Sequence, residues 1–141
     1  MSNGKAETQA LLNEAIPFAE EMLAKYGELF PFARALGPSG DVISIVGYDG
    51  REHPPSDEVI NLLERGLRRG AAAGEYVTTA LVYDVRLTPK YTARPTDAIA
   101  AELEHVGGCA VTVFFPYCLQ DGRPRLGSPF ATAASRAIFS D

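Results

Sequence analysis

The sequence predicts an α+β fold, with an antiparallel sheet of about five to six strands and two main helices packed on one face. Two observations carry this prediction. Apolar and polar side chains alternate over residues 75–87 and 96–117, which is the period of a β-strand. Apolar residues recur every three or four positions over residues 6–26 and 56–73, which is the period of an α-helix. The predicted order is α-β-β-α-β-β-β, with a further short strand, in a single domain spanning residues 1–141.

The first predicted helix runs from about Ala6 to Tyr26. Thr8 is placed to cap its N-terminus, and Gly27 is placed to end it in the left-handed conformation. Pro17 lies inside the pattern, where it removes a backbone donor and crowds the preceding turn, so we expect a kink or a split there. Its apolar stripe consists of Leu11, Leu12, Ile16, Phe18, Ala19, Met22, Leu23 and Tyr26.

A hairpin follows, with strands at residues 29–36 and 41–48 around the turn residues 38–40. Because Pro31 cannot donate to a strand ladder, we predict that the first of these strands lies at an edge of the sheet. Ser56 then caps the second helix, and Gly74 ends it. The buried stripe of this helix consists of Val59, Ile60, Leu63 and Leu67.

The side chains of the next hairpin decide its register. A two-residue loop, 107–108, would place Glu102 opposite a core valine. A three-residue loop, 106–108, instead pairs Leu103 with Val111 and keeps the apolar rows together. Three-residue loops need a residue in the left-handed region near their end, which Gly108 supplies, so we predict the second register. The buried row predicted for the preceding strand consists of Val77, Leu81, Tyr83, Val85 and Leu87.

Residues beyond the Asp121-Gly122 turn carry a weaker pattern. A short strand is predicted near residues 125–130, and the segment 131–139 is compatible with a strand or a short helix. The order of elements resembles that of profilin-like and roadblock-like domains. This resemblance concerns element order alone and implies no role for any residue.

Composition excludes several classes of protein. The net charge of −5 arises in the first half of the chain, which disfavours a nucleic-acid surface. No apolar run approaches membrane-spanning length and no signal region opens the chain, so we expect a cytoplasmic protein without membrane contact. Cys109 and Cys118 lie nine residues apart on one predicted strand, roughly 30 Å in an extended chain, so both are predicted to be free thiols.

No cofactor fingerprint, metal-ligand cluster or nucleophile motif occurs, so no cofactor or metal is predicted. The polar loop at residues 47–55 contains Asp49, Glu52 and His53, which could act as acid, base or ligand, although turn chemistry explains the same residues. His105 falls on the buried row beside Cys109, and we interpret it as a histidine bonded to the backbone rather than as half of a Cys–His nucleophile.

One row of the sheet indicates a partner. The row predicted to face outward is mostly apolar and is lengthened by Ala80 and Val82 of the preceding strand. We expect a homodimer through this face or a sheet edge, or a protein partner. Alternatively, the C-terminal segment folds back over the row through Phe130, Ile138 and Phe139. The predicted interface residues are Ala98, Ala100, Thr112 and Phe114.

The sequence therefore favours a small non-catalytic soluble module, a homodimeric binding, adaptor or regulatory domain, over an enzyme. The alternative is a small-molecule-binding domain or enzyme with a pocket between sheet and helices. That pocket would use Tyr48, Asp49, His53, Tyr83 and Arg86. A basic cluster of Arg86, Lys90 and Arg94 has no assigned role at this point.

Overall fold

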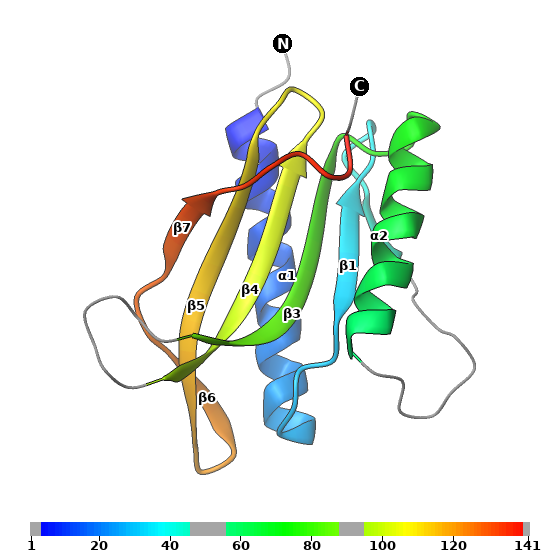
Figure 1. Ribbon diagram of the computed structural model, residues 1–141. Helices are drawn as coiled ribbons and strands as arrows, with labels where there is room; N and C mark the ends of the chain where they lie inside the picture. Colours follow the sequence, from blue (N-terminus) through cyan, green and yellow to red (C-terminus); the bar gives the residue numbers. More distant parts are fainter. Residues whose placement is uncertain (1–3, 46–55, 88–94, 140–141) are drawn as a thin grey trace.

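The computed structural model describes residues 4–45, 56–87 and 95–139, and it confirms the α+β class and the predicted element order. Figure 1 shows a single twisted sheet with its two helices. In chain order the elements are α1 (Gly4–Tyr26), β1 (Phe32–Leu36), β2 (Val42–Ile45), α2 (Ser56–Ala72), β3 (Thr78–Leu87), β4 (Thr96–His105), β5 (Ala110–Gln120), β6 (Arg123–Leu126) and β7 (Phe130–Ala133).

The sheet has the strand order β2-β1-β3-β4-β5-β6, with β7 also paired to β5, and every pairing is antiparallel. The predicted register of the β4–β5 hairpin is confirmed, because Leu103 lies opposite Val111 and Ile99 opposite Phe115. Gly108 has a φ of 114°, as the three-residue loop requires. The sheet has seven strands rather than five or six, because the C-terminal segment supplies both β6 and β7.

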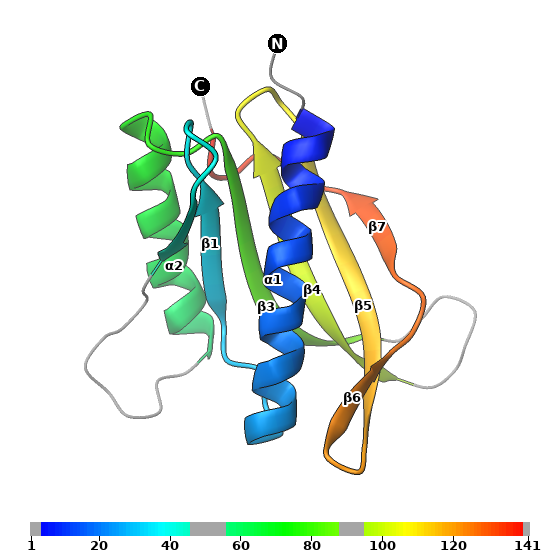
Figure 2. The ribbon, with the colours of Figure 1, turned by 180° about the vertical axis from the view of Figure 1, so that it is seen from behind.

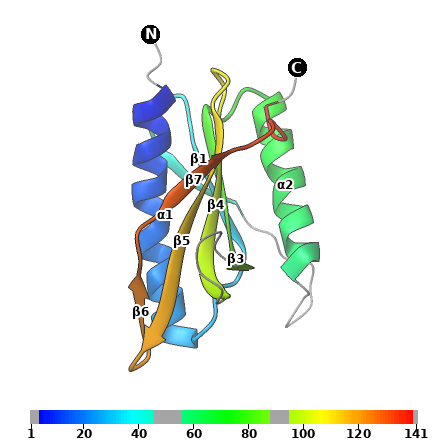
Figure 3. The same ribbon diagram turned by 60° about the vertical axis from the view of Figure 1, so that its left-hand side comes forward.

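The two helices lie on opposite faces of the sheet, not on one face as predicted (Figure 3). The first five residues of β3 are all buried, because this part of the strand is covered on both faces. Ala80 and Val82 pack against α1, while Leu81 packs against α2. The prediction that Ala80 and Val82 lie on an outward row is therefore wrong. A strand covered on both faces loses the alternation from which a single buried row is predicted.

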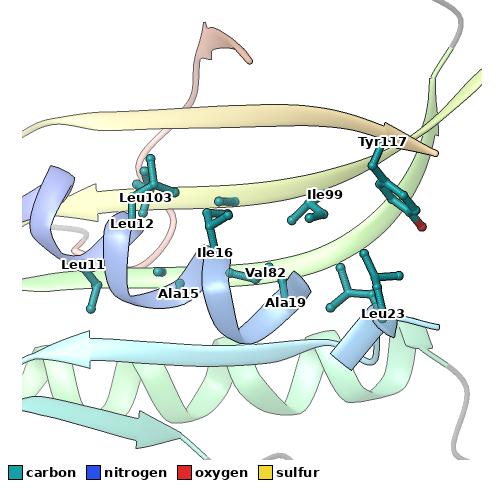
Figure 4. Packing of buried hydrophobic residues seen from close by; sticks show 13 residues of the cluster. Leu11, Leu12, Ala15, Ile16, Ala19, Leu23, Val82, Ile99, Leu103 and Tyr117 are labelled. Atoms are coloured by element: carbon teal, nitrogen blue, oxygen red, sulfur yellow. The ribbon is translucent and has the colours of Figure 1, made fainter. Parts of the chain in front are cut away.

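Helix α1 lies across β3 and β4 and builds the larger core with them (Figures 2 and 4). It runs unbroken through Pro17, whose side chain is exposed, so the predicted split is absent. The helix begins at Gly4, and the Thr8 hydroxyl donates to the Gly4 carbonyl at 2.6 Å instead of capping the N-terminus. Gly27 has a φ of 71° and ends the helix as predicted.

Strand β1 is not an edge strand, because it lies between β2 and β3. Pro31 precedes the first residue of β1, so no ladder donor is lost within the strand. Helix α2 begins at Ser56 and packs on β1 and β3, and Gly74 has the predicted left-handed φ, 74°. None of the described helices is long and apolar enough to cross a membrane.

Strand β5 continues through Pro116 because its outer edge changes partners there. Residues 117–120 pair with β6 and residues 111–114 pair with β7. The N–H and C=O of one strand residue point to the same side, and the Pro116 carbonyl accepts from Gly127 N–H at 2.7 Å on the outer side. The missing donor of Pro116 therefore faces the change of partner, where no ladder bond is lost. Both cysteines are free, as predicted, and both are exposed.

Candidate functional site

The two faces of the sheet are covered to different extents. We call them the α1 face and the α2 face after the helix that each one carries. Helix α2 covers the part of its face over β1 and β3 (Figure 1). Over β4 and β5, no helix of the described chain lies on this face. We call this area the open half-face, and it consists of Tyr83, Val85, Ala98, Ala100, Glu102, Thr112, Phe114, Pro116 and Phe130.

Small residues form the centre of the open half-face, and aromatic residues flank them. Ala98 and Ala100 are fully buried. Ala100 lies opposite Tyr83 on one side and Phe114 on the other. Strand β7 adds Phe130, whose ring stacks on that of Phe114 with centroids 5.2 Å apart. Phe130 remains 44% exposed, so the aromatic pair presents apolar surface to its surroundings.

Glu102 is the charged residue of the open half-face. A hydrogen bond from Tyr83 offsets part of the free energy that its partial burial costs. The Tyr83 hydroxyl donates a hydrogen bond to the Glu102 carboxylate. Burial raises the pKa of the Tyr83 phenol, and the bond to Glu102 raises that pKa further, so Tyr83 remains a donor at neutral pH. Because the Glu102 carboxylate already accepts a hydrogen bond, its desolvation by a partner costs less free energy.

All four predicted interface residues lie on the open half-face. Ala98, Ala100 and Thr112 are nevertheless buried, so Phe114 offers most of the contact area among the four. Phe130 was predicted only as part of the C-terminal fold-back over this row, and not as an interface residue. Its strand is only four residues long and all four are exposed, so no alternation of burial marks it.

The residues predicted to line a small-molecule pocket are not brought together in the described part of the chain. Tyr48, Asp49 and His53 lie outside the described residues. Tyr83 points to the α2 face, whereas Arg86, three positions along β3, points to the α1 face. Arg86 is largely exposed and donates to Asp97 at 3.2 Å. The remaining members of the basic cluster, Lys90 and Arg94, also lie outside the described residues.

The C-terminal segment crosses the end of the α2 face and reaches α2 (Figures 1 and 3). Its backbone is held by Glu104, a residue with only 7% exposure. The carboxylate accepts from the N–H groups of Ala137, Ile138 and Phe139 at 3.0–3.4 Å. The Arg68 guanidinium donates to the Ala137 carbonyl at 2.9 Å. The predicted fold-back through residues 138–139 therefore covers the end of this face.

His105 is buried and fully engaged on the α1 face. Its Nδ1 accepts from Gly107 N–H at 2.9 Å, and its Nε2 lies 3.1 Å from a Glu7 carboxylate oxygen. This pattern corresponds to the neutral tautomer with hydrogen on Nε2. The prediction of a backbone-bonded histidine is confirmed. Because both ring nitrogens are occupied, His105 offers no free base to the exposed thiol of Cys109.

A second polar pair lies near the other end of the α1 face. The Tyr117 hydroxyl donates to Asp84 at 2.9 Å. Burial raises the pKa of Asp84, the Tyr117 bond opposes this, and the nearby charge of Asp97 raises the pKa again. The described residues contain no group of three or more histidine, cysteine, aspartate or glutamate side chains that could hold a metal ion.

A further exposed cluster lies where α1 meets β1. The Arg34 guanidinium stacks over the ring of Phe18 at 4.6 Å and over that of Phe32 at 5.8 Å. Phe18, Tyr26 and Phe30 are all more than one-third exposed. Such a mixture is typical of contact surfaces, but these side chains already pack on one another, and charged Glu21 and Lys25 lie among them.

No protein-family model matches this chain, and no match was found among curated proteins or among solved structures. Inference about its role therefore depends on the geometry of its own residues.

Proposed function

We propose that this protein is a small non-catalytic module that forms a two-fold dimer through the open half-face and acts as a binding, adaptor or regulatory domain. One observation carries the proposal: an aromatic and alanine-rich surface lies beside α2 with no helix of the described chain over it. Contiguous apolar surface of this kind is typical of contacts between proteins.

A second copy is favoured as the occupant because the α2 face has a step. Helix α2 stands one layer above the sheet, and the open half-face lies beside it at sheet level (Figure 3). A two-fold axis that lies between the two copies and runs parallel to the strands places α2 of each copy over the open half-face of the other. The same patch then serves both copies, as a closed dimer requires.

The size of the surface indicates that α2 must take part. Three strands spaced about 4.8 Å apart and about ten residues long cover roughly 460 Å² of flat sheet. Stable interfaces bury about 800 Å² on each partner. The flank of α2 that faces β4, with Ile60 and Glu64, would supply the difference. The charge of Glu64 contributes to the raised pKa of Tyr83, after burial and the bond to Glu102.

The substitution Phe114→Glu tests the proposal, with Leu119→Glu as the matched control. Both residues are apolar and lie on β5, but Leu119 points to the α1 face and is 42% exposed. A carboxylate at position 114 would be buried in the dimer without a partner, so we expect the dissociation constant to rise at least 100-fold. Native mass spectrometry should show twice the 15.1 kDa chain mass for the unchanged protein and for Leu119→Glu, and the single mass for Phe114→Glu.

A dimer that persists in Phe114→Glu would show that another surface mediates assembly. The natural second choice is then the cluster around Arg34, tested by Phe18→Glu. A monomer in the unchanged protein would exclude the homodimer and leave a different protein as the partner of the open half-face.

A further inference from the structure

Aromatic and basic side chains gather on the α1 face, where the C-terminal half of α1 lies beside β1 (Figure 2). We call them the Arg34 cluster, which consists of Phe18, Lys25, Tyr26, Phe30, Phe32 and Arg34. A hollow of about 330 Å³ lies among them. The rings of Phe18, Tyr26 and Phe30 line this hollow and are 38–55% exposed. The cluster therefore surrounds a depression with open aromatic surface.

Arg34 lies against aromatic rings and not against a carboxylate. Its guanidinium carbon is 4.6 Å from the centre of the Phe18 ring and 5.8 Å from that of Phe32. Its Nε–H is buried and meets no acceptor, and none of the ion pairs among the described residues includes Arg34. The rings fix the plane of the guanidinium, whose fork of N–H donors matches a carboxylate. Arg34 is therefore prepared to bind a carboxylate from outside the described chain.

Local charge favours the same kind of occupant. The Lys25 ammonium lies 5.2 Å from the centre of the Tyr26 ring, so a second cation borders the hollow. Glu21 is the acidic residue of its lining. Two cations and one carboxylate leave this area positive, although the whole chain has a net charge of −5. A positive patch attracts an acidic partner and disfavours a basic one.

Contacts within the cluster hold it in place before any partner arrives. The rings of Phe18 and Phe32 meet edge to face at 4.8 Å, and those of Tyr26 and Phe30 at 5.7 Å. The Phe30 N–H also donates to the Met22 sulfur at 3.0 Å, which ties the start of β1 to α1. Side chains that are already ordered lose little entropy on binding. Tyrosine and arginine are also enriched among the residues that dominate binding energy at interfaces.

We propose that the Arg34 cluster is a docking site for an acidic segment of a partner protein. An aromatic side chain of the segment enters the hollow, and a neighbouring carboxylate pairs with Arg34. Phe18 borders the hollow and also stacks on Arg34, so both groups of the segment bind side by side. The site does not depend on the dimer, because the open half-face lies on the other face of the sheet.

Three short synthetic peptides test the site. The first contains a phenylalanine between two aspartates, the second has asparagines in place of the aspartates, and the third has an alanine in place of the phenylalanine. The ¹⁵N-labelled protein is titrated with each, and NMR follows the Arg34 Nε–H and the backbone amides of residues 22–32. The first peptide should shift these resonances to saturation. The other two should bind at least about tenfold more weakly, because each lacks one of the two contacts.

Variants of the protein identify the residues that bind. Arg34→Gln removes the fork and should weaken the first peptide at least about tenfold. The matched control is Arg86→Gln, because Arg86 is an exposed arginine of the same face that pairs with Asp97 and lies outside the cluster. It should bind the peptide like the unchanged protein. Tyr26→Ala removes a ring that is 55% exposed, so the fold should persist while the affinity falls.

Glu21→Gln gives a change in the opposite direction. The exposed carboxylate of Glu21 repels an acidic peptide, so its removal should raise the affinity about two- to fivefold. A damaged fold cannot produce such a gain. Equal binding before and after this substitution, or equal binding of the aspartate and asparagine peptides, would overturn the recognition of an acidic segment.

The remaining outcomes separate this site from the proposed dimer. Phe114→Glu should bind the first peptide as tightly as the unchanged protein does. A native dimer that leaves the resonances of the cluster unmoved by the peptide would overturn the docking site and leave the dimer intact. A monomer that binds the peptide would do the reverse. A dimer that survives Phe114→Glu but is lost in Phe18→Glu would place a second copy on the cluster and overturn both.

Discussion

The two faces of the sheet contain similar small residues under different coverings. On the α1 face, Ala80 and Ala101 lie beneath a 23-residue helix that crosses the middle strands. On the α2 face, Ala98 and Ala100 are just as buried, yet no helix of the described residues covers them. In the register of the sheet, Ala100 lies between Tyr83 and Phe114. Zero exposure of these small residues is therefore reached without a helix of the described residues above them.

The comparison extends to polar chemistry, because each face holds one tyrosine that donates to one carboxylate. Tyr117 donates to Asp84 on the α1 face, and Tyr83 donates to Glu102 on the α2 face. Burial raises the pKa of both phenols. The pairs are alike in the single chain, so a partner that covers only the open half-face would make them different.

The largest expected effect is on the α1 core. Leu103→Ala removes a side chain with 2% exposure and leaves a cavity under α1, so the free energy of unfolding should fall by about 2–5 kcal/mol. Phe114→Ala, measured as a monomer at low concentration, should cost only about 1 kcal/mol, because this half-buried ring has no helix above it. Urea denaturation of both variants is the measurement. Equal losses would indicate that the open half-face is covered like the α1 core.

The next largest effect concerns the C-terminal segment, residues 134–139. Glu104→Ala removes the acceptor of three N–H groups and should lower the free energy of unfolding by about 1–3 kcal/mol. Amide hydrogen exchange at residues 137–139 should accelerate at least tenfold, while exchange in the β4–β5 ladder should change little. The matched control is Glu102→Ala, which removes a carboxylate two residues away on the same face. Unchanged exchange at residues 137–139 would contradict the role of Glu104.

The smallest effect is a pH dependence that compares the two tyrosines. Because folding raises both phenol pKa values above about 10, the value in an unfolded chain, each contribution to stability is complete below pH 10. It is lost as the pH rises further, because the unfolded chain releases the proton first. Tyr83→Phe and Tyr117→Phe should each make the alkaline decline of the unfolding free energy less steep.

The same titration can be repeated with the dimer and with Phe114→Glu. If the dimer covers the open half-face, phenolate absorbance should show that Tyr83 ionises at a higher pH in the dimer. Tyr117 should ionise at the same pH in both. A parallel change of the two tyrosines would show that assembly does not distinguish the two faces.

Local sequence was sufficient for the parts of the fold that local chemistry determines. The register of β4 and β5 followed from alternation and from Gly108, and both were confirmed. The helix ends at Gly27 and Gly74 followed from the same left-handed conformation. These features involve neighbours within a few residues, where side-chain period and backbone preference act directly.

The errors involved contacts between distant segments. The continuous burial of residues 78–82 concealed the presence of a helix on each face. The partners of Glu104 lie more than thirty residues away in the C-terminal segment, and no local pattern predicts them. The predicted pocket grouped Tyr83 with Arg86, although side chains three positions apart on a strand point to opposite faces of the sheet. Tyr48, Asp49 and His53 remain untested predictions.

The position of α1 has a consequence for the newly made chain. This helix is synthesised before its partners on β3, β4 and β5, which follow about 55 to 90 residues later. At about 5–20 residues per second, the ribosome needs several seconds to supply them. Throughout that interval the leucine stripe of α1 has no sheet to cover it. The packing of α1 on the sheet is therefore completed only after β3, β4 and β5 have been synthesised.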